Sequence, residues 1–368
     1  MSMKLEYGAP EDVGMDPSRL NFLKELTTRW INKGAFPGAV YLIARKGIVI
    51  AYEALGNAVK TPFTREMRKD TIFDMASLTK VMATATSIMT LVERGYISLK
   101  EKVIDYFPDA KWRHKQITLW HLLTHTSGLP PFKPVHKLGR DGIIKAILNS
   151  EQLVEPGKRV IYSDLGYILL AEIVKEVSKK SLDVYSSENI FIPLGMKDTM
   201  FNPPERLKER IAATEFCKWR GRVLIGEVHD ERAYALGGIA GHAGLFSTAF
   251  DVAIFAQMFL NLGKYDRVRV LSPSTVKKMT KNHTKGMGAR RGLGWLLNSR
   301  GVTSSGDLLS MKAYGHTGFT GTSLWIDPKL KLTMVLLTNR VHPTRENEMI
   351  LRFRPLFHNV VAGSILKK

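Results

Sequence analysis

Two pairs of apolar segments at opposite ends of the chain constrain the fold more than any other feature of the sequence. Near the N-terminus, residues 39–44 (AVYLIA) and 48–52 (IVIAY) are separated by a short polar turn that contains Gly47. Near the C-terminus, residues 322–327 (TSLWID) and 332–339 (LTMVLLTN) are separated by four residues. Strand-forming segments joined by short turns are typical of β-hairpins. The sequence therefore predicts an antiparallel sheet to which both ends of the chain contribute.

The middle of the chain is predicted to be mostly helical. Apolar residues recur at helical spacing over 77–94, 164–179 and 249–262. Helices are also predicted at the two ends, one starting at Asp16 and the other from about Glu346, where Pro355 would bend it.

These predictions give an α+β fold with two parts. Residues 1–75 and 290–368 would form a sheet domain flanked by helices, and residues 76–289 would form an inserted, mostly helical domain. We expect an active site in the cleft between them.

The charge of the chain is strongly basic, with 54 Lys+Arg against 34 Asp+Glu and a net charge of +20. The positive residues are scattered in short runs such as Lys179–Lys180 and Arg290–Arg291, which is typical of a solvated surface and not of a nucleic-acid site. The single cysteine, Cys217, excludes an intrachain disulfide, and no apolar run approaches a membrane span. The N-terminus has no apolar signal-peptide core. We expect a cytoplasmic protein that binds neither nucleic acid nor membranes, and we leave its oligomeric state open.

The segment FDMASLTKVMATATSIM, residues 73–89, places Ser77 and Lys80 three residues apart in an otherwise apolar helix. Their side chains would lie one turn apart on the same face. Burial disfavours the charged lysine, so the pKa of Lys80 should fall toward a range where it accepts a proton. Ser77 would lie near the helix start, where free N–H groups favour developing negative charge. This arrangement is typical of an activated serine nucleophile.

Two further segments supply groups that could serve such a nucleophile. Tyr162 comes just before the predicted helix 164–179, and a phenol near a lysine can ionise below its usual pKa and take the serine proton. The segment YGHTGFTG carries His316, Thr317 and Gly318 at the entry to a predicted strand, where the Phe319 N–H could face an oxyanion.

Metal sites and phosphate-binding loops find no support in the sequence. His121 and His125 are four residues apart, but no Glu follows His121 as in zinc peptidases. Gly238, Gly241 and Gly244 do not have the spacing of a phosphate-binding loop. We therefore expect no metal and no cofactor.

In this order, Ser77-x-x-Lys80, Tyr162-Ser163-Asp164 and His316-Thr317-Gly318 resemble the three motifs of the penicillin-recognising serine hydrolases. The segments ITLWHLLTHTSGLP and LGGIAGHAGLFSTAFDVAIFAQMFL are similar to the branch related to class C β-lactamases. The resemblance covers roughly residues 10 to 340, and it implies a β-lactamase/transpeptidase-like fold.

The resemblance also implies a role for each residue of the site. Ser77 would be the acylated nucleophile, with Lys80 and Tyr162 handling its proton. The N–H groups of Ser77 and Phe319 would form the oxyanion hole. The substrate-binding residues would be Asp164, His316, Thr317, Gly318 and His242, the last of which could equally be structural.

Two departures from the family pattern bear on the substrate. Many relatives have Asn where this chain has Asp164, and a carboxylate cannot donate a hydrogen bond to an amide carbonyl. Asp164 could also hold Lys80 protonated, which would leave Tyr162 as the base. His316 replaces a lysine and so removes a permanent cation that could hold a substrate carboxylate.

Because of these departures, we predict a carboxylesterase that acts on small esters and has weak or no β-lactamase activity. The alternative is a D-amino-acid peptidase, DD-carboxypeptidase or amidase of the same family. A non-enzymatic ligand-binding protein on this fold is a more distant alternative, because the chain retains Ser77, Lys80 and Tyr162.

Overall fold

The central element of the fold is a mostly antiparallel sheet with the strand order β1-β3-β2-β15-β14-β13-β12, to which β4 adds by pairing with β3. The computed structural model describes residues 4–108, 116–299, 301 and 303–366. The strands of this sheet are β1 (Glu6–Tyr7), β2 (Gly38–Arg45), β3 (Ile48–Val59), β4 (Arg65–Glu66), β12 (Leu296–Leu297), β13 (Tyr314–Thr317), β14 (Ser323–Asp327) and β15 (Leu332–Thr338).

The two chain ends meet inside this sheet, because β15 pairs antiparallel with β2 and places Val335 opposite Leu42. Both predicted hairpins are confirmed: β2 pairs with β3 through a turn at Gly47, and β14 pairs with β15. The prediction of a sheet built from both ends of the chain is therefore confirmed.

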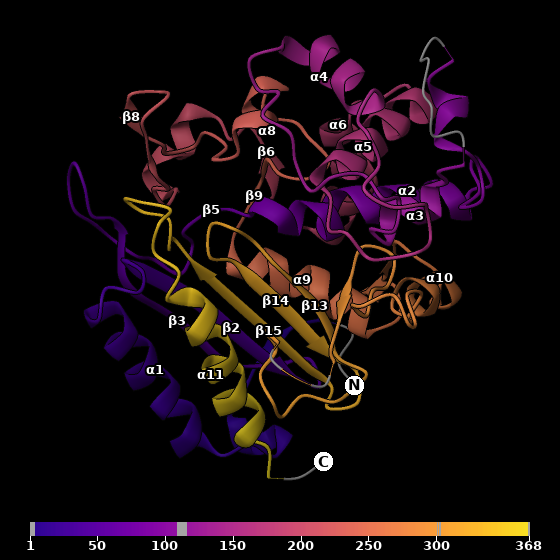
Figure 1. Ribbon diagram of the computed structural model, residues 1–368. Helices are drawn as coiled ribbons and strands as arrows, with labels where there is room; N and C mark the ends of the chain where they lie inside the picture. The colour runs from indigo at the N-terminus through magenta and orange to yellow at the C-terminus, as the bar shows by residue number, and fades with distance from the viewer. Residues whose placement is uncertain (1–3, 109–115, 300, 302, 367–368) are drawn as a thin grey trace.

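Helices cover both faces of the sheet (Figure 1). On one face, α1 (Pro17–Asn32) and α11 (Ile350–Gly363) lie side by side and bury residues such as Leu23, Trp30 and Phe353 against the sheet. On the other face, α9 (Ala249–Leu260) packs against β2, β14 and β15. Removal of these apolar faces from water drives the layered packing.

The remaining elements lie mostly beyond one edge of the sheet, above it in Figure 1. The helices are α2 (Thr86–Glu93), α3 (Leu119–Leu123), α4 (Gly139–Leu148), α5 (Asp164–Ser178), α6 (Leu182–Ser186), α7 (Ile192–Leu194), α8 (Glu231–Ala235) and α10 (Pro273–Met279). The short strands are β5 (Phe73–Asp74), β6 (Met200–Phe201), β7 (Phe216–Cys217), β8 (Arg222–Val223), β9 (Leu245–Ser247), β10 (Lys264–Tyr265) and β11 (Val268–Arg269). Among the described helices, none is long and apolar enough to cross a membrane.

The helix predicted over 77–94 differs from the observed backbone. It consists of a 3-10 turn (Ala76–Leu78), a π-helical stretch (Lys80–Ala85) and then α2. The Thr86 hydroxyl donates to the Val81 carbonyl at 2.7 Å and so competes for a carbonyl that a regular α-helix would use. π-Helical turns of this kind often mark functional sites.

The predicted division at residues 76 and 289 stays a proposal. α9 lies within residues 76–289 by sequence, yet it covers the sheet. The helices predicted at 164–179 and 249–262 are confirmed as α5 and α9.

Candidate active site

Ser77 lies at the point where the chain leaves β5 and enters the helical region. The buried carboxylate of Asp74 fixes this turn, because it accepts hydrogen bonds from the N–H groups of Ala76 at 2.8 Å and His229 at 2.7 Å. Ala76 has a φ of 44°, a left-handed conformation that costs a non-glycine residue energy and that clusters at functional sites. The surrounding hydrogen bonds therefore hold Ser77 on a strained, well-defined turn.

The turn after β13 is tied directly to the backbone that precedes Ser77. The hydroxyl of Thr320 donates to the Asp74 carbonyl at 2.7 Å, and that of Thr322 donates to the Met75 carbonyl at 3.1 Å. A Cβ atom at Gly318 would lie 2.6 Å from the Met75 carbonyl oxygen, so only glycine fits there. These contacts bring Phe319 to the same pocket as Ser77.

Lys80 is fully buried and its ammonium group is matched by three acceptors. Its Nζ lies 3.0 Å from Ser77 Oγ, 2.8 Å from Asp164 Oδ1 and 3.0 Å from the His242 carbonyl oxygen. Burial lowers the pKa of Lys80, but the interactions with Asp164 and Tyr162 outweigh burial and raise it. The expectation of a lowered pKa is therefore wrong, and Lys80 is protonated in this arrangement.

Tyr162 lies among aromatic and cationic groups. Its ring centroid is 4.4 Å from that of His125 and 6.0 Å from that of His316, and the Lys80 Nζ lies 4.9 Å from it. The Arg291 guanidinium carbon lies 5.3 Å from the same centroid. Two cations therefore lie beside the ring of Tyr162.

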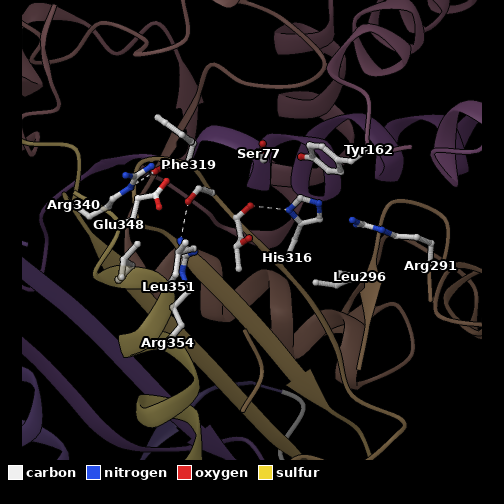
Figure 2. Close-up of a pocket in the computed structure, with 13 residues that line it drawn as sticks. Ser77, Tyr162, Arg291, Leu296, His316, Phe319, Arg340, Glu348, Leu351 and Arg354 are labelled. Carbon is white, nitrogen blue, oxygen red and sulfur yellow. Dashed lines mark hydrogen bonds between the residues drawn. The ribbon is translucent and has the colours of Figure 1, made fainter. Parts of the chain in front are cut away.

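A pocket of about 380 Å³ collects most of the predicted site residues (Figure 2). It is lined by Ser77, Tyr162, Arg291, Leu296, His316, Thr317, Gly318, Phe319, Arg340, Glu348, Ile350, Leu351 and Arg354. Residues from three distant parts of the sequence therefore meet at one cavity, with Lys80 behind Ser77.

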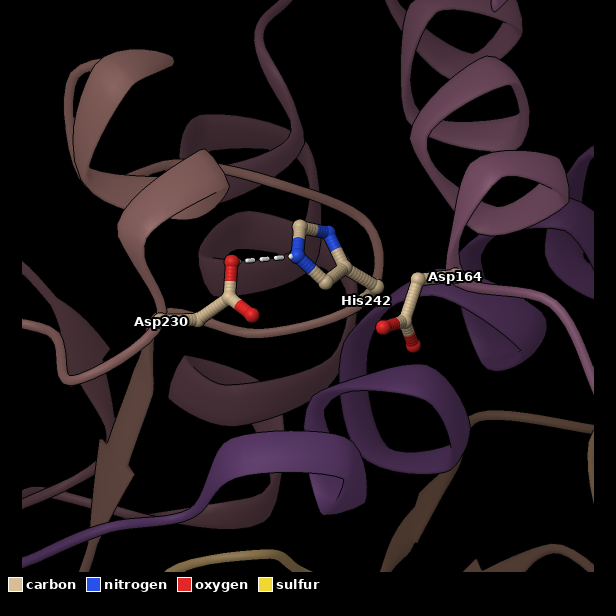
Figure 3. Close-up of side chains that lie close together, drawn as sticks. All are labelled: Asp164, Asp230 and His242. Carbon is tan, nitrogen blue, oxygen red and sulfur yellow. Dashed lines mark hydrogen bonds and ion pairs between the residues drawn. The ribbon is translucent and has the colours of Figure 1, made fainter. Parts of the chain in front are cut away.

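Asp164 and His242, expected to bind substrate, do not line this pocket. Asp164 bridges Lys80 and Arg232, whose NH2 atom lies 2.8 Å from Asp164 Oδ2. The buried ring of His242 bonds instead to Asp230, with 2.8 Å between Nε2 and Oδ1 (Figure 3). Both side chains are engaged by charged neighbours.

Asp164, Asp230 and His242 also form a candidate cluster of metal ligands in the described part of the chain (Figure 3). One ligand atom from each residue lies within 4.8 Å of the other two. Their carboxylates already pair with two cations, Lys80 and Arg232. A divalent metal would have to displace both, so the donor set does not fit a metal.

Arg291 is a pocket residue that the sequence analysis missed. It was included in a run of surface charges, yet its Nε and NH1 atoms are buried and have no hydrogen-bond partner among the described residues. Figure 2 shows its side chain directed toward His316. Burial and the charge of Arg291 hold the pKa of His316 well below its usual range, so that histidine is neutral. The apolar sequence after Arg291, GLGWLL, was the available signal for burial.

Comparison with known proteins places these features in context. The family model described as beta-lactamase matches residues 21–356. A protein named "Putative D-alanyl-D-alanine carboxypeptidase" from Escherichia coli K12 is 33% identical over an alignment of 376 residues that covers 92% of this chain and 86% of that protein. An "N-acetylmuramyl-L-alanine amidase" from Bacillus subtilis 168 is 34% identical over 370 residues, covering 90% and 83%.

Solved structures show the same fold at lower identity. The hydrolase EstCE1, described as having promiscuous acyltransferase activity, superposes with a TM-score of 0.76 at 22% identity over 95% of this chain and 99% of that one. An octameric penicillin-binding protein homologue from Pyrococcus abyssi gives a TM-score of 0.74 at 23% identity over 95% and 78%. The predicted β-lactamase/transpeptidase-like fold is therefore confirmed.

Proposed function

Because this chain belongs to the beta-lactamase family of serine hydrolases, we propose that it acts through an acyl-enzyme on Ser77 and cleaves an amide whose leaving group ends in a carboxylate. This corresponds to a carboxypeptidase-type activity. The observation that carries the substrate class is Arg291, whose buried Nε and NH1 atoms have no hydrogen-bond partner among the described residues and whose side chain lines the pocket that contains Ser77.

The proposed mechanism assigns the proton transfers to Tyr162. A protonated Lys80 cannot accept a proton, so the base that takes the proton of Ser77 in this mechanism is Tyr162, acting as its phenolate. Ser77 Oγ attacks the carbonyl carbon, and the N–H groups of Ser77 and Phe319 stabilise the resulting oxyanion. Tyr162 then protonates the leaving amine as the C–N bond breaks. A water molecule that gives its proton to Tyr162 hydrolyses the ester of Ser77 by the reverse sequence.

Arg291 supports a carboxylate-bearing substrate for a physical reason. A buried guanidinium with unmatched N–H donors is costly, and a carboxylate satisfies two of these donors at once. His316 is neutral, so Arg291 supplies the permanent cation that the histidine does not. The name of the Escherichia coli relative describes a peptidase that releases a C-terminal residue, which is consistent with this substrate class.

A carboxylesterase is the second candidate, and Asp164 is the observation that favours it. Both carboxylate oxygens of Asp164 are held by cations, and neither can donate a hydrogen bond to a substrate amide carbonyl. An ester needs no such donor. Arg291 favours a carboxylate-bearing amide and Asp164 favours an ester, so the preference for esters stays a prediction.

The test compares three substrates: diacetyl-L-Lys-D-Ala-D-Ala, the same peptide with a C-terminal amide, and p-nitrophenyl acetate. Ser77→Ala should lose at least 10³-fold in kcat/KM on every substrate that is cleaved. Arg291→Gln should raise KM for the free-acid peptide about 10-fold to 100-fold, as expected for a lost charge-assisted hydrogen bond. It should change KM for the amidated peptide and the ester far less.

Arg290→Gln is the matched control, since it removes the neighbouring positive charge from a side chain that bonds to the Asn298 carbonyl outside the pocket. Cleavage of the ester alone would make the esterase the better reading. Equal losses on all substrates in Arg291→Gln would argue against a carboxylate contact, and activity that survives Ser77→Ala would exclude the proposed nucleophile.

A further inference from the structure

Arg354 is a buried cation that has no carboxylate partner within ion-pair distance among the described residues. It lies in α11, its side chain is almost completely buried, and its NH2 atom donates to the carbonyl oxygens of Gly318 at 2.8 Å and Thr322 at 2.9 Å. Its Nε has no partner in the described part of the chain. An unpaired buried charge destabilises a fold, so this arginine requires a functional explanation.

The charge of Arg354 persists despite its burial. Burial and the nearby Arg340 lower the pKa of Arg354 to about 9, which still leaves the guanidinium protonated at neutral pH. Arg354 therefore places a full positive charge at hydrogen-bond distance from the turn that follows β13 (Figure 2).

The Gly318 carbonyl and the Phe319 N–H belong to the same peptide group. The Gly318 oxygen accepts hydrogen bonds from Arg354 and from the N–H of Gly321, the latter at 3.1 Å. Donors to a carbonyl draw electron density toward its oxygen, and hydrogen bonds in such a chain strengthen one another. The N–H at the other end of the peptide consequently becomes a better donor.

We propose that Arg354 is a positioning residue that strengthens the oxyanion hole by polarising the Gly318–Phe319 peptide. This inference rests on the proposed function, in which the Phe319 N–H binds the oxyanion. Arg354 holds the peptide in place through two carbonyls and makes its N–H more acidic, without contacting the reacting atoms.

Arg340 provides a matched comparison on the same turn. Its Nε donates to the Phe319 carbonyl at 2.7 Å, and its NH1 donates to the carbonyls of Arg345 and Asn347. The Phe319 carbonyl belongs to the next peptide group, whose N–H is that of Thr320. Loss of Arg340 would also remove a cation and a hydrogen bond from the turn, but it would not remove charge from the peptide that carries the Phe319 N–H.

The experiment uses phenylboronic acid, which bonds covalently to a serine oxygen and places a boronate oxygen in the oxyanion hole, and p-nitrophenyl acetate, which carries no carboxylate. Arg354→Gln should lower kcat/KM for the ester about 10-fold, less than the 10²-fold to 10³-fold for deletion of an oxyanion donor. The Ki of phenylboronic acid should rise by a similar factor. Arg354→Lys keeps the charge, so it should recover part of the loss in kcat/KM and part of the loss in inhibitor affinity. Arg340→Gln should change the Ki less than about threefold.

Several outcomes would overturn the inference. Equal effects of Arg354→Gln and Arg340→Gln would indicate that both arginines only hold the turn in place. A loss of turnover without a change in the Ki would show that Arg354 does not act on the oxyanion hole. Thermal unfolding checks that each variant is folded. If Arg354→Gln is not, Arg354→Met against Arg340→Met removes the same two charges, and Arg354→Met should raise the Ki more. If phenylboronic acid inhibits wild type and Ser77→Ala binds it equally well, the proposed function fails, independently of Arg354.

Discussion

At the scale of single residues, the protonation of Lys80 follows from the groups that pair with it and with its partners. Asp164 lies between Lys80 and Arg232, and Asp230 lies between Arg232 and His242, with each contact at 2.7 to 2.8 Å. Burial is the largest single influence on the pKa of Lys80, but the interactions with Asp164 and Tyr162 together outweigh it. The site therefore keeps a cation next to Ser77, which is consistent with the proposal that Tyr162 is the base.

Asp164→Asn tests this assignment through the pH profile. Without the carboxylate, burial dominates and the pKa of Lys80 falls, so Lys80 loses its proton at a lower pH. The alkaline limb of the kcat/KM profile should move toward neutral pH, and activity at pH 8 should fall on the order of 10-fold to 100-fold. Asp230→Asn is the control, because Asp230 does not contact Lys80 and should shift the limb less. An unmoved limb would show that Lys80 is not the titrating group.

Arg291 and Lys80 show what residue patterns can and cannot predict. The three motifs identified Ser77, Tyr162 and the turn at Gly318, which line one pocket. The state of each charged group depended on its burial and on partners distant in sequence, and no motif contains that information. One such property is that Arg291 has no carboxylate partner within ion-pair distance in the part of the chain that the structure describes.

At the scale of elements, side-chain hydroxyls decide how the predicted helices begin and bend. Thr86 helps to convert the turn after Lys80 into a π-helical stretch, and Thr248 caps α9 by accepting a hydrogen bond from the Asp251 N–H at 3.3 Å. The cap was visible in the sequence as a Thr-x-x-Asp spacing. The π-helical stretch was not, because helical periodicity does not separate it from an α-helix.

Thr248→Ala tests the contribution of the cap to stability. Because α9 packs against the central sheet, loss of the cap should lower the free energy of unfolding of the whole protein by about 1 kcal/mol. Thr248→Ser keeps the hydroxyl and should stay close to wild type. Urea denaturation at pH 7 measures both, and equal stability of the alanine and wild-type proteins would contradict the capping role.

At the scale of the whole molecule, buried histidines make stability depend on pH. His358 on α11 is fully buried, its Nδ1 lies 2.7 Å from the Ser304 carbonyl, and burial lowers its pKa to about 4. The unfolded chain takes up this proton near pH 6.5, while the native protein does not. The unfolded state therefore binds more protons between about pH 6.5 and pH 4, and stability is lost as the pH falls through that range.

His358→Asn isolates this contribution. From pH 7 to pH 5, His358 should account for a loss of about 2 kcal/mol in the free energy of unfolding of wild type. The asparagine amide can still donate to the Ser304 carbonyl but does not titrate, so the variant should lose correspondingly less over the same interval. Urea denaturation at both pH values gives the two differences, whatever the stability of the variant at pH 7. Identical differences would show that His358 does not titrate on unfolding.

The sequence alone determined the architecture of this protein and located the residues that we propose to react. Hairpin patterns at both ends predicted the sheet, and the three motifs predicted the residues that line the pocket with Ser77. Only the tertiary structure decided the charge of Lys80 and the placement of Arg291 in the pocket. The physical reason is that strand pairing and motifs follow from local residue types, whereas a buried charge depends on every group that folding brings within a few ångströms of it.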